Sequence, residues 1–489
     1  MFHCRLLVAC CLFFLSLTTT LSAMAEEASP NRTEALGKRI ERLEAIITVL
    51  TDELDGRRDR WAPGSLAEID FYRAEAEVSD RLEQMEHNLQ QVRQRVSVAV
   101  EELESVSQFF ERQREPGFSM GDTQITFGGY VKFDTIVSRY SDGAPPSSSA
   151  GRDFYVPSTV AASFNGARET VLDFSPRESR FLFKTETPLG DDTLGSHLEL
   201  DFLVTDNDNE IVSNSFTPRL RQAYLTYRNF LFGQAWSTFL NVAAIPENLD
   251  FVGPTEAVVF ARQPMVRYTR GPFEIAIENP ETTITARDGS RLVPDADRLP
   301  DLTARYTFTT RAGEIKLAGL LRQLRTDGAT LLAGGGTAIT PDDNRTAIGY
   351  GLSLSGRLKL NTRDDLRFMA NYGDGGGRYF AVALIDGAAI GPDGDLDTIE
   401  AYSGYLSYRH FWAPRWRSNF TVGYFRANNP TLLTGFTPTD QVFSGHINLL
   451  YSPVNRLTVG AEVIFARRRL EVGSQGDLNR LQFSARYGF

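Results

Sequence analysis

Polar and apolar residues alternate one by one at the end of the chain. An extended strand there would carry Leu481, Phe483, Ala485, Tyr487 and Phe489 on one side and Arg480, Gln482, Ser484 and Arg486 on the other. A strand of a soluble sandwich alternates in the same way. The closing strand of a transmembrane barrel also needs a lipid-facing apolar side and a terminal aromatic ring in the interfacial girdle. The pattern favours a membrane barrel that closes at Phe489.

The same period of two recurs from about residue 120 onward, for example at 124–133, 198–202, 302–308, 366–372 and 457–465. Some connections are short, such as Asn229 and Gly271-Pro272. Others are long and rich in turn residues, at 141–154, 206–214, 287–298, 326–344, 374–397 and 428–440. Outer-membrane barrels alternate tight periplasmic turns with long outer loops in this way. We therefore predict an all-β transmembrane barrel over residues 117–489, with about 16 antiparallel strands and with about 14 or 18 also open.

Between residues 26 and 116 the apolar period changes to seven, which predicts an α-helical coiled coil. One stretch runs from Leu36 to Leu54 and another from Val78 to Phe110, and Pro63-Gly64 breaks the helix near residues 57–64. In the second stretch, leucine at the first core position and β-branched or small residues at the second favour a trimer. A helical hairpin that folds back on itself stays open.

The first 25 residues have the pattern of a signal peptide. Arg5 gives the positive charge, residues 6–21 the apolar region, and Ala23-Met24-Ala25 the cleavage site. The alternative is a lipoprotein signal that ends at Cys10, which would leave a very short apolar region. No later apolar run is long enough for a spanning helix. The predicted location is a Gram-negative-type outer membrane, with the coiled coil in the periplasm.

Charge and motifs narrow the function. The net charge is −11, or −12 without Arg5, which argues against nucleic acid as a partner. The excess of 46 arginines over 5 lysines reflects either genomic base composition or a need for rigid forks that hold carboxylates. The usual motifs of serine hydrolases, zinc proteases and phosphate loops are missing, so we expect no enzyme and assign no catalytic residue. The absence of these motifs does not exclude a hydrolase whose site is assembled from residues of different strands.

Strand parity assigns several charges to the lumen, because a charge that faces lipid at mid-depth costs about 2–4 kcal/mol. Arg305, for instance, is out of phase with Leu302, Tyr306 and Phe308. The candidate wall of the constriction consists of Arg180, Lys184, Arg221, Arg267, Arg305 and Arg322, although the strands of Arg221 and Arg322 are mixed on both faces. A wide aqueous lumen is lined with charge in any case, so some of these groups could simply neutralise acids.

Residues 238–261 are too apolar for an exposed loop, since Val242, Phe251 and Phe260 need cover. We expect this segment to fold into the lumen and narrow the pore, with Glu247, Asp250 and Glu256 set opposite arginines of the wall. The alternative is an outer loop that packs on itself or on a neighbouring subunit.

Two other segments, at 206–210 and 393–397, place oxygen ligands at alternate positions, as calcium loops do. Neither completes the twelve-residue pattern. Calcium at the outer loops stays open beside plain solvated turns, and no other cofactor or metal is expected.

Several motifs of the chain resemble the DcaP-type family of trimeric outer-membrane porins. They are GGYVKFD at 128–134, SRFLFKTETP at 179–188, LELDF at 198–202, RQAYLTY at 221–227, FGQAWS at 232–237, IPENLDF at 245–251 followed by Gly253-Pro254, and RQPMVRY at 262–268. Beyond residue 310 the likeness is one of architecture. The family has an N-terminal periplasmic coiled coil, which is longer and interrupted in this chain. The resemblance implies a homotrimer that takes up small, mostly anionic solutes such as dicarboxylates.

The sequence thus predicts a porin for small hydrophilic and preferentially anionic, dicarboxylate-like solutes. Expected partners are further copies of the chain in a homotrimer, outer-membrane lipid and the barrel-assembly machinery, with peptidoglycan as a further candidate. Two other functions remain as alternatives. One is a structural tether between outer membrane and cell wall through the coiled coil, and the other is an outer-membrane hydrolase.

Overall fold

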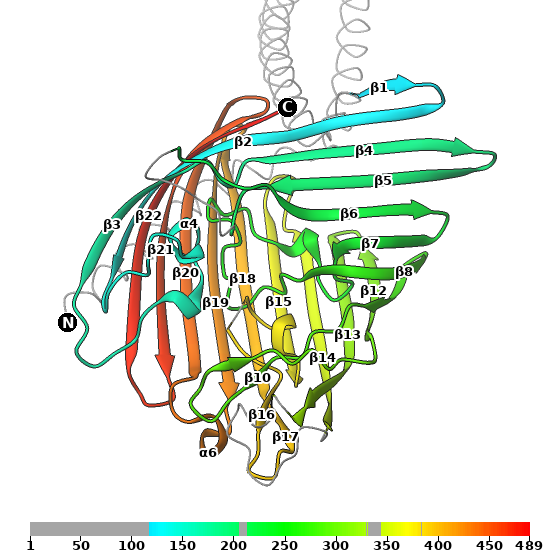
Figure 1. The fold of residues 1–489 in the computed structure, drawn as a ribbon. Helices are drawn as coiled ribbons and strands as arrows, with labels where there is room; N and C mark the ends of the chain where they lie inside the picture. Colours follow the sequence, from blue (N-terminus) through cyan, green and yellow to red (C-terminus); the bar gives the residue numbers. More distant parts are fainter. Residues whose placement is uncertain (1–116, 205–212, 329, 331–343, 383) are drawn as a thin grey trace, which may run out of the picture. The chain divides into compact units, whose positions relative to one another are not determined.

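A computed structural model describes residues 117–489 except 205–212, 329, 331–343 and 383. The predicted signal peptide and coiled coil lie outside the described residues. Sixteen antiparallel strands form a closed barrel, as the sequence predicted (Figure 1). In chain order these strands are β2 (Thr123–Tyr140), β4 (Arg180–Leu189), β5 (Asp192–Asp201), β6 (Arg219–Tyr227), β7 (Phe230–Trp236), β8 (Arg262–Arg270), β9 (Phe273–Glu278), β12 (Asp301–Thr310), β13 (Gly313–Asp327), β14 (Asn344–Lys359), β15 (Asp365–Asp374), β18 (Glu400–Ala413), β19 (Trp416–Asn428), β20 (Thr439–Val454), β21 (Leu457–Leu470) and β22 (Gln475–Gly488).

The barrel closes where β22 pairs with β2, for example at Leu481 and Val137. On its other side β2 pairs first with β4 and then with β3 (Glu169–Ser175), so β3 and β4 together act as one interrupted strand. The interruption falls at Pro176, which has no N–H for the ladder. A short strand, β1 (Gly117–Met120), forms a hairpin with the start of β2.

Short and long connections alternate around the barrel as expected. The turns at 190–191, 228–229, 271–272, 311–312, 414–415 and 455–456 contain two residues each. Most of the connections at the other end are long, and two of them contribute a small sheet of β10 (Ile284–Thr285), β11 (Arg291–Leu292), β16 (Ala388–Ile390) and β17 (Leu396–Thr398). Figure 1 shows this sheet gathered at one end of the barrel and the C-terminus at the other.

Helical turns are few among the described residues. They are α4 (Ala150–Asp153), η1 (Pro157–Thr159), η2 (Val242–Ala244), η3 (Gly377–Tyr379) and α6 (Thr431–Thr434). No helix in the described part of the chain is long and apolar enough to span a membrane.

The predicted parity of the closing strand is observed. Leu481, Phe483 and Tyr487 are 37%, 48% and 52% exposed on the outer face, whereas Arg480 and Gln482 are 1% exposed on the inner face. An outer face of large apolar side chains is what contact with lipid requires, because hydrocarbon offers no partner to a charge.

The inner face is not an empty tube, because three connections enter it and pack on the wall. Their apolar side chains form one buried cluster with wall residues such as Met369, Tyr405 and Phe425. Glycines of the wall make room for them. A Cβ on Gly351 of β14 would lie 2.9 Å from the ring of Phe380 and 3.3 Å from that of Phe239. The glycine there lets two inserted aromatic rings reach the wall.

We expect Gly351→Leu to destabilise the barrel, because overpacking a filled site costs about 1–3 kcal/mol. The matched control is Gly445→Leu on β20, where an added Cβ meets nothing within 4 Å. The temperature at which each folded barrel shifts to its unfolded gel mobility measures the effect. Equal temperatures for the two variants would contradict the packing described above.

Candidate functional site: the lumen and its infolded loop

The β7–β8 connection, residues 237–261, inserts into the lumen, and we call it the infolded loop. Its backbone carbonyls accept hydrogen bonds from inward side chains of strands far apart in the ring. The pairs are Leu240 with Arg305, Ala244 with Tyr405, Ile245 with Arg367, Glu247 with Asn419 and Asn448, Leu249 with Lys132 and Gln482, and Ala257 with Asn371. Because these partners belong to strands from β12 through β22 to β2, the infolded loop follows the inner wall over a large part of the ring.

Glu247 of the infolded loop contacts two arginines of the wall. Arg417 donates from Nε to both carboxylate oxygens at 3.0 Å, and Arg409 donates from Nη1 at 3.0 Å. Burial raises the pKa of this loop carboxyl, but Arg417 and Arg409 outweigh burial and lower that pKa to about 2. Glu247 is therefore ionised at neutral pH, and its contribution to stability would be lost only as the pH falls from about 4.5 towards 2.

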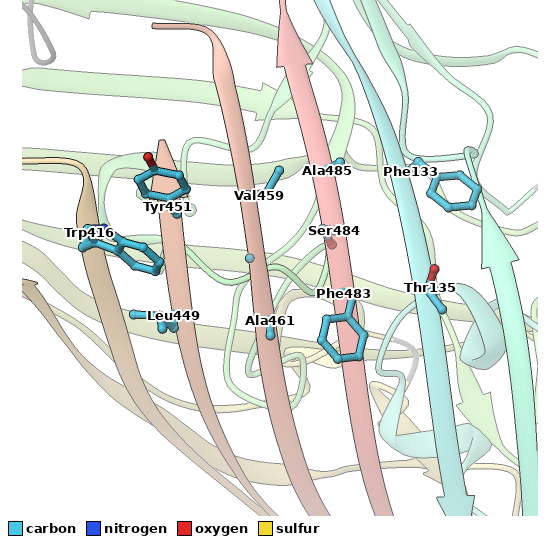
Figure 2. Close-up of a pocket in the computed structure, with 11 residues that line it drawn as sticks. Phe133, Thr135, Trp416, Leu449, Tyr451, Val459, Ala461, Phe483, Ser484 and Ala485 are labelled. Atoms are coloured by element: carbon cyan, nitrogen blue, oxygen red, sulfur yellow. The ribbon is translucent and has the colours of Figure 1, made fainter. Parts of the chain in front are cut away.

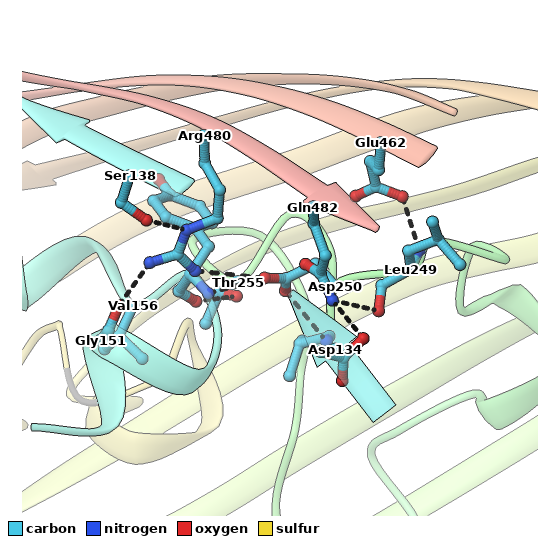
Figure 3. Close-up of polar contacts among 12 residues, drawn as sticks. Asp134, Ser138, Gly151, Val156, Leu249, Asp250, Thr255, Glu462, Arg480 and Gln482 are labelled. Carbon is cyan, nitrogen blue, oxygen red and sulfur yellow. Dashed lines mark hydrogen bonds and ion pairs between the residues drawn. The ribbon is translucent and has the colours of Figure 1, made fainter. Parts of the chain in front are cut away.

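Asp250 and the wall residue Arg480 connect the infolded loop to a second insertion, the β2–β3 connection (Figure 3). Arg480 Nη1 lies 3.7 Å from Asp250 Oδ2, and Arg480 Nη2 donates to the carbonyl of Gly151. Asp250 Oδ2 in turn accepts from the backbone N–H of Tyr155 at 2.7 Å. One buried arginine thus holds two inserted segments against β22.

Glu256 lies in a cluster of polar and acidic side chains, unlike Glu247, which contacts arginines. It accepts from Ser444 at 2.5 Å, and Ser444 lies 3.2 Å from His446. His446 is 3.3 Å from Glu462, which also accepts the backbone N–H of Leu249. Glu256 was expected to face arginines of the wall, but within the part of the chain that the structure describes its contacts are with Ser444 and the neighbouring polar groups.

The third insertion is the β15–β18 connection around η3. Tyr379 donates to Asp301 at 3.0 Å, and its ring lies 5.9 Å from that of Phe239 in an edge-to-face arrangement. The backbone N–H of Val382 donates to Thr255 of the infolded loop. The sequence predicted one infolded segment, whereas among the described residues the β2–β3, β7–β8 and β15–β18 connections all pack on the inner wall.

The predicted wall residues Arg267 and Arg305 converge on one carboxylate. Arg305 Nε donates to Glu274 at 2.7 Å, and Arg267 Nη1 lies 3.8 Å from the same side chain. Arg267 also donates to Thr238 at 2.8 Å, which ties it to the start of the infolded loop. Two cations therefore face one acid at this point of the wall.

Arg180 and Arg221 lie together on the neighbouring arc. Arg221 donates to Glu199 at 2.6 Å and to Asp201 at 2.7 Å, while Arg180 lies 3.2 Å from Glu199. Between β5 and β6 the register shifts by one residue, so that Leu220 stays outward while Arg221 turns inward. Such a bulge re-aims a side chain, and it explains why both faces of this strand read as mixed.

The remaining predicted residues have different surroundings. Arg322 is fully buried, where it donates to the carbonyls of Glu281 and Gly376 and lies 3.4 Å from Asp301. It supports the η3 segment beneath the lumen surface. Lys184 shares its strand face with Arg180 and pairs in register with Thr126 and His197.

Phe489 packs on the outer face at the short-turn end. Its ring lies 5.7 Å from Phe127 and 6.0 Å from Phe181, and its N–H donates to Gly129 at 3.1 Å. Gly129 has a φ of +146°, and a Cβ there would meet the carbonyl of Arg180. Glycine is needed where the two ends of the barrel wall come together.

Four wall arginines that sequence reasoning did not single out lie near the short-turn end: Arg357, Arg367, Arg409 and Arg417. Strand parity was the available signal, since Arg367 alternates with Leu366 and Phe368. Of the segments considered for calcium, 206–210 lies outside the described residues. Asp395 of the other lies 3.4 Å from Arg345, and the calcium hypothesis stays a prediction.

An open apolar hollow of about 480 Å³ lies on the outer face of the barrel, not in the lumen (Figure 2). Its residues come from β2, β19, β20, β21 and β22 and include Phe133, Trp416, Tyr451 and Phe483. Trp416 and Tyr451 stack with centroids 4.4 Å apart. An exposed apolar surface of this kind is typical of the lipid-facing side of a membrane barrel.

A closed sixteen-stranded barrel with an apolar exterior, a charged interior and a loop folded across it defines an outer-membrane channel of the porin type. The chain belongs to the DcaP outer membrane protein family, whose model matches residues 83–489. No curated protein sequence matches the chain.

One solved structure supports the fold, and two others are more distant. The outer-membrane channel DcaP of Acinetobacter baumannii is 23% identical, with a TM-score of 0.61 over 76% of this chain and 99% of that one. OmpF of Salmonella typhi is 10% identical, with a TM-score of 0.48 over 76% and 100%. An anion-selective porin from Comamonas acidovorans is 12% identical, with a TM-score of 0.44 over 75% and 100%.

We expect Arg480→Met to lower the unfolding temperature of the barrel, because it leaves Asp250 buried without its cation, at a cost of about 3–5 kcal/mol. The double variant Asp250→Asn with Arg480→Met should recover part of that loss, since no charge is then orphaned. Thermal unfolding of the three proteins in detergent measures both effects. A double variant no more stable than the single one would show that the ion pair is not what anchors the loop.

Proposed function

We propose that this channel passes small hydrophilic solutes and prefers anions of the size of dicarboxylates. The observation that carries the proposal is an excess of arginine along one continuous arc of the inner wall. Arg267 and Arg305 face Glu274, with Glu278 also near Arg267, and Arg180, Arg219 and Arg221 face Glu199 and Asp201. Farther along, Arg357, Arg367, Arg409 and Arg417 face Asp365 and Glu247.

The remaining arc, around β20 to β22 and β2, carries Asp134 and Glu462, and the acids Glu178, Asp250 and Glu256 of the connections lie beside it. Lys132 and Arg480 on the same arc offset part of this negative charge. Positive and negative walls that face each other create a field across the pore, which orients a dipolar solute. Carboxylate solutes would follow the arginine arc, because planar guanidinium forks match the carboxylate geometry.

The net charge of the whole chain has the opposite sign, at −11. Many acids lie far from the lumen, for example Asp393 and Asp395 in the β16–β17 turn and Asp477, whose pair with Arg467 is half exposed. Screening over about 8–10 Å at physiological salt limits their influence at the constriction. The arginines nearest the solute would therefore set the selectivity.

We further propose a homotrimer. The supporting observations are the broad apolar outer face near β2 to β4, with Phe127, Phe133 and Phe174 about half exposed, and the neighbouring hollow at Trp416. The tether hypothesis rests on residues outside the described part of the chain, and the family together with the fold favours a channel over a hydrolase.

The zero-current potential across a bilayer in a KCl gradient tests the selectivity. We expect the anion-selective sign in the wild type and a shift towards cations in Arg267→Ser with Arg305→Ser, because Glu274 then stands alone. The control is Arg228→Ser with Arg467→Ser, which removes the same charge from side chains 62% and 49% exposed outside the constriction. A cation-selective potential that neither pair changes would contradict the proposal.

Single insertion events in planar bilayers test the assembly. A trimer of identical channels should open in three equal conductance steps, and the steps should retain their size ratio in the variants above. Single isolated steps from a folded preparation would argue against three pores per particle, whereas no conductance at all would favour the tether.

A further inference from the structure

Arg357, Arg367, Arg409 and Arg417 lie near the short-turn end, apart from the Arg267–Arg305 pair, and two of them contact the carboxylate of Glu247. Arg417 meets the Glu247 carboxylate with a fork, from Nε at 3.0 Å and from Nη2 at 2.5 Å. Arg409 adds a third donor at 3.0 Å. This is the geometry with which arginine binds a free carboxylate.

The two arginines are held in place by groups other than Glu247. Arg417 Nη1 donates to Ser452 at 2.9 Å, and Arg409 Nη2 donates to Asp365. Asp365 also accepts from Arg367 at 2.9 Å and is only 2% exposed. The donors of the site would therefore keep their positions if the Glu247 carboxylate moved away.

Glu247 itself is the exchangeable member. Its side chain is 30% exposed, against 8% for Arg409 and 4% for Arg417. Its backbone carbonyl is held separately by the amides of Asn419 at 2.8 Å and Asn448 at 3.0 Å. The carboxylate can thus swing into the lumen without releasing the infolded loop from the wall.

We propose that Arg409 and Arg417 form a carboxylate-binding site that Glu247 occupies in the absence of solute and yields to a carboxylate passing through the pore. This inference rests on the proposed anion channel and adds a second solute-binding site along the pore, besides the Arg267–Arg305 pair. Without the Glu247 carboxylate, Arg357, Arg367 and Arg409 would still face Asp365 and Arg417 would still donate to Ser452, so a solute with two carboxylates meets several arginine donors there.

Competition by Glu247 keeps the site weak. A tethered carboxylate acts at an effective concentration of millimolar or higher, so a free one must compete with it. Conduction needs weak binding at each site in the pore, because a solute that binds tightly does not leave. When no solute is bound, the Glu247 carboxylate also offsets part of the positive charge of the neighbouring arginines.

Succinate binding to the detergent-solubilised full-length protein, measured by titration calorimetry, tests the competition. Glu247→Gln keeps the backbone contacts and should lower the Kd for succinate about tenfold. Adding Arg409→Gln and Arg417→Gln to this variant should abolish the gain. Asp477→Asn removes one carboxylate from an arginine pair on the outer face and should leave the Kd unchanged.

A second readout separates binding from a loosened loop. In liposome swelling, Glu247→Gln should change the uptake of succinate relative to wild type but not that of arabinose, a neutral solute of similar size. A Glu247→Gln protein that binds succinate no more tightly than Asp477→Asn, or that admits both solutes faster to the same extent, would overturn the proposal.

The outcome is separable from that of the channel proposal. An anion-selective zero-current potential with an unchanged succinate Kd would reject only this site. A cation-selective potential with the tenfold change would reject the anion preference and retain the site.

Discussion

Irregular backbone inside a membrane barrel must find hydrogen-bond partners, and the rest of the lumen is arranged around this constraint. The infolded loop has little regular structure beyond η2, so its carbonyls depend on the wall. Arginine, lysine, asparagine, glutamine and tyrosine side chains supply the donors. The inward face of the barrel is thus polar for two reasons, since it borders water and it also completes the backbone of the loop.

The architecture could be predicted from the sequence because a strand with one face in lipid has a strict period of two. The outward side chains of Leu481 and Phe483 and the inward Arg480 follow from that period alone, and so do the short turns at Asn229 and Gly271. The infolded loop was predictable for a related reason. A run with Phe251 and Phe260 needs cover, and a connection as long as 237–261 has only the lumen or a neighbour to provide it.

Contacts across the lumen were not predictable, because parity gives the direction of a side chain and not its height along the barrel axis. Glu247 was expected to meet arginines of the wall, and it meets Arg409 and Arg417, about 160 to 170 residues away in sequence. Arg221 was ambiguous because a register shift changes the period locally. The β15–β18 insertion was hidden in residues 374–397, which were predicted to be a turn-rich connection although they contain an apolar run that begins at Tyr379 and Phe380.

The same arginines serve two purposes that place opposite demands on them. Arg305 and Arg367 donate to loop carbonyls and also face acids of the wall, so they are fixed on several sides and are costly to disturb. A channel also needs charges whose partner can be replaced by the solute. The difference lies in exposure, since Asp365 is sealed in the wall whereas the Glu247 carboxylate borders the lumen. A structural ion pair and an exchangeable one can therefore share the same guanidinium, with one partner of Arg409 on each side of it.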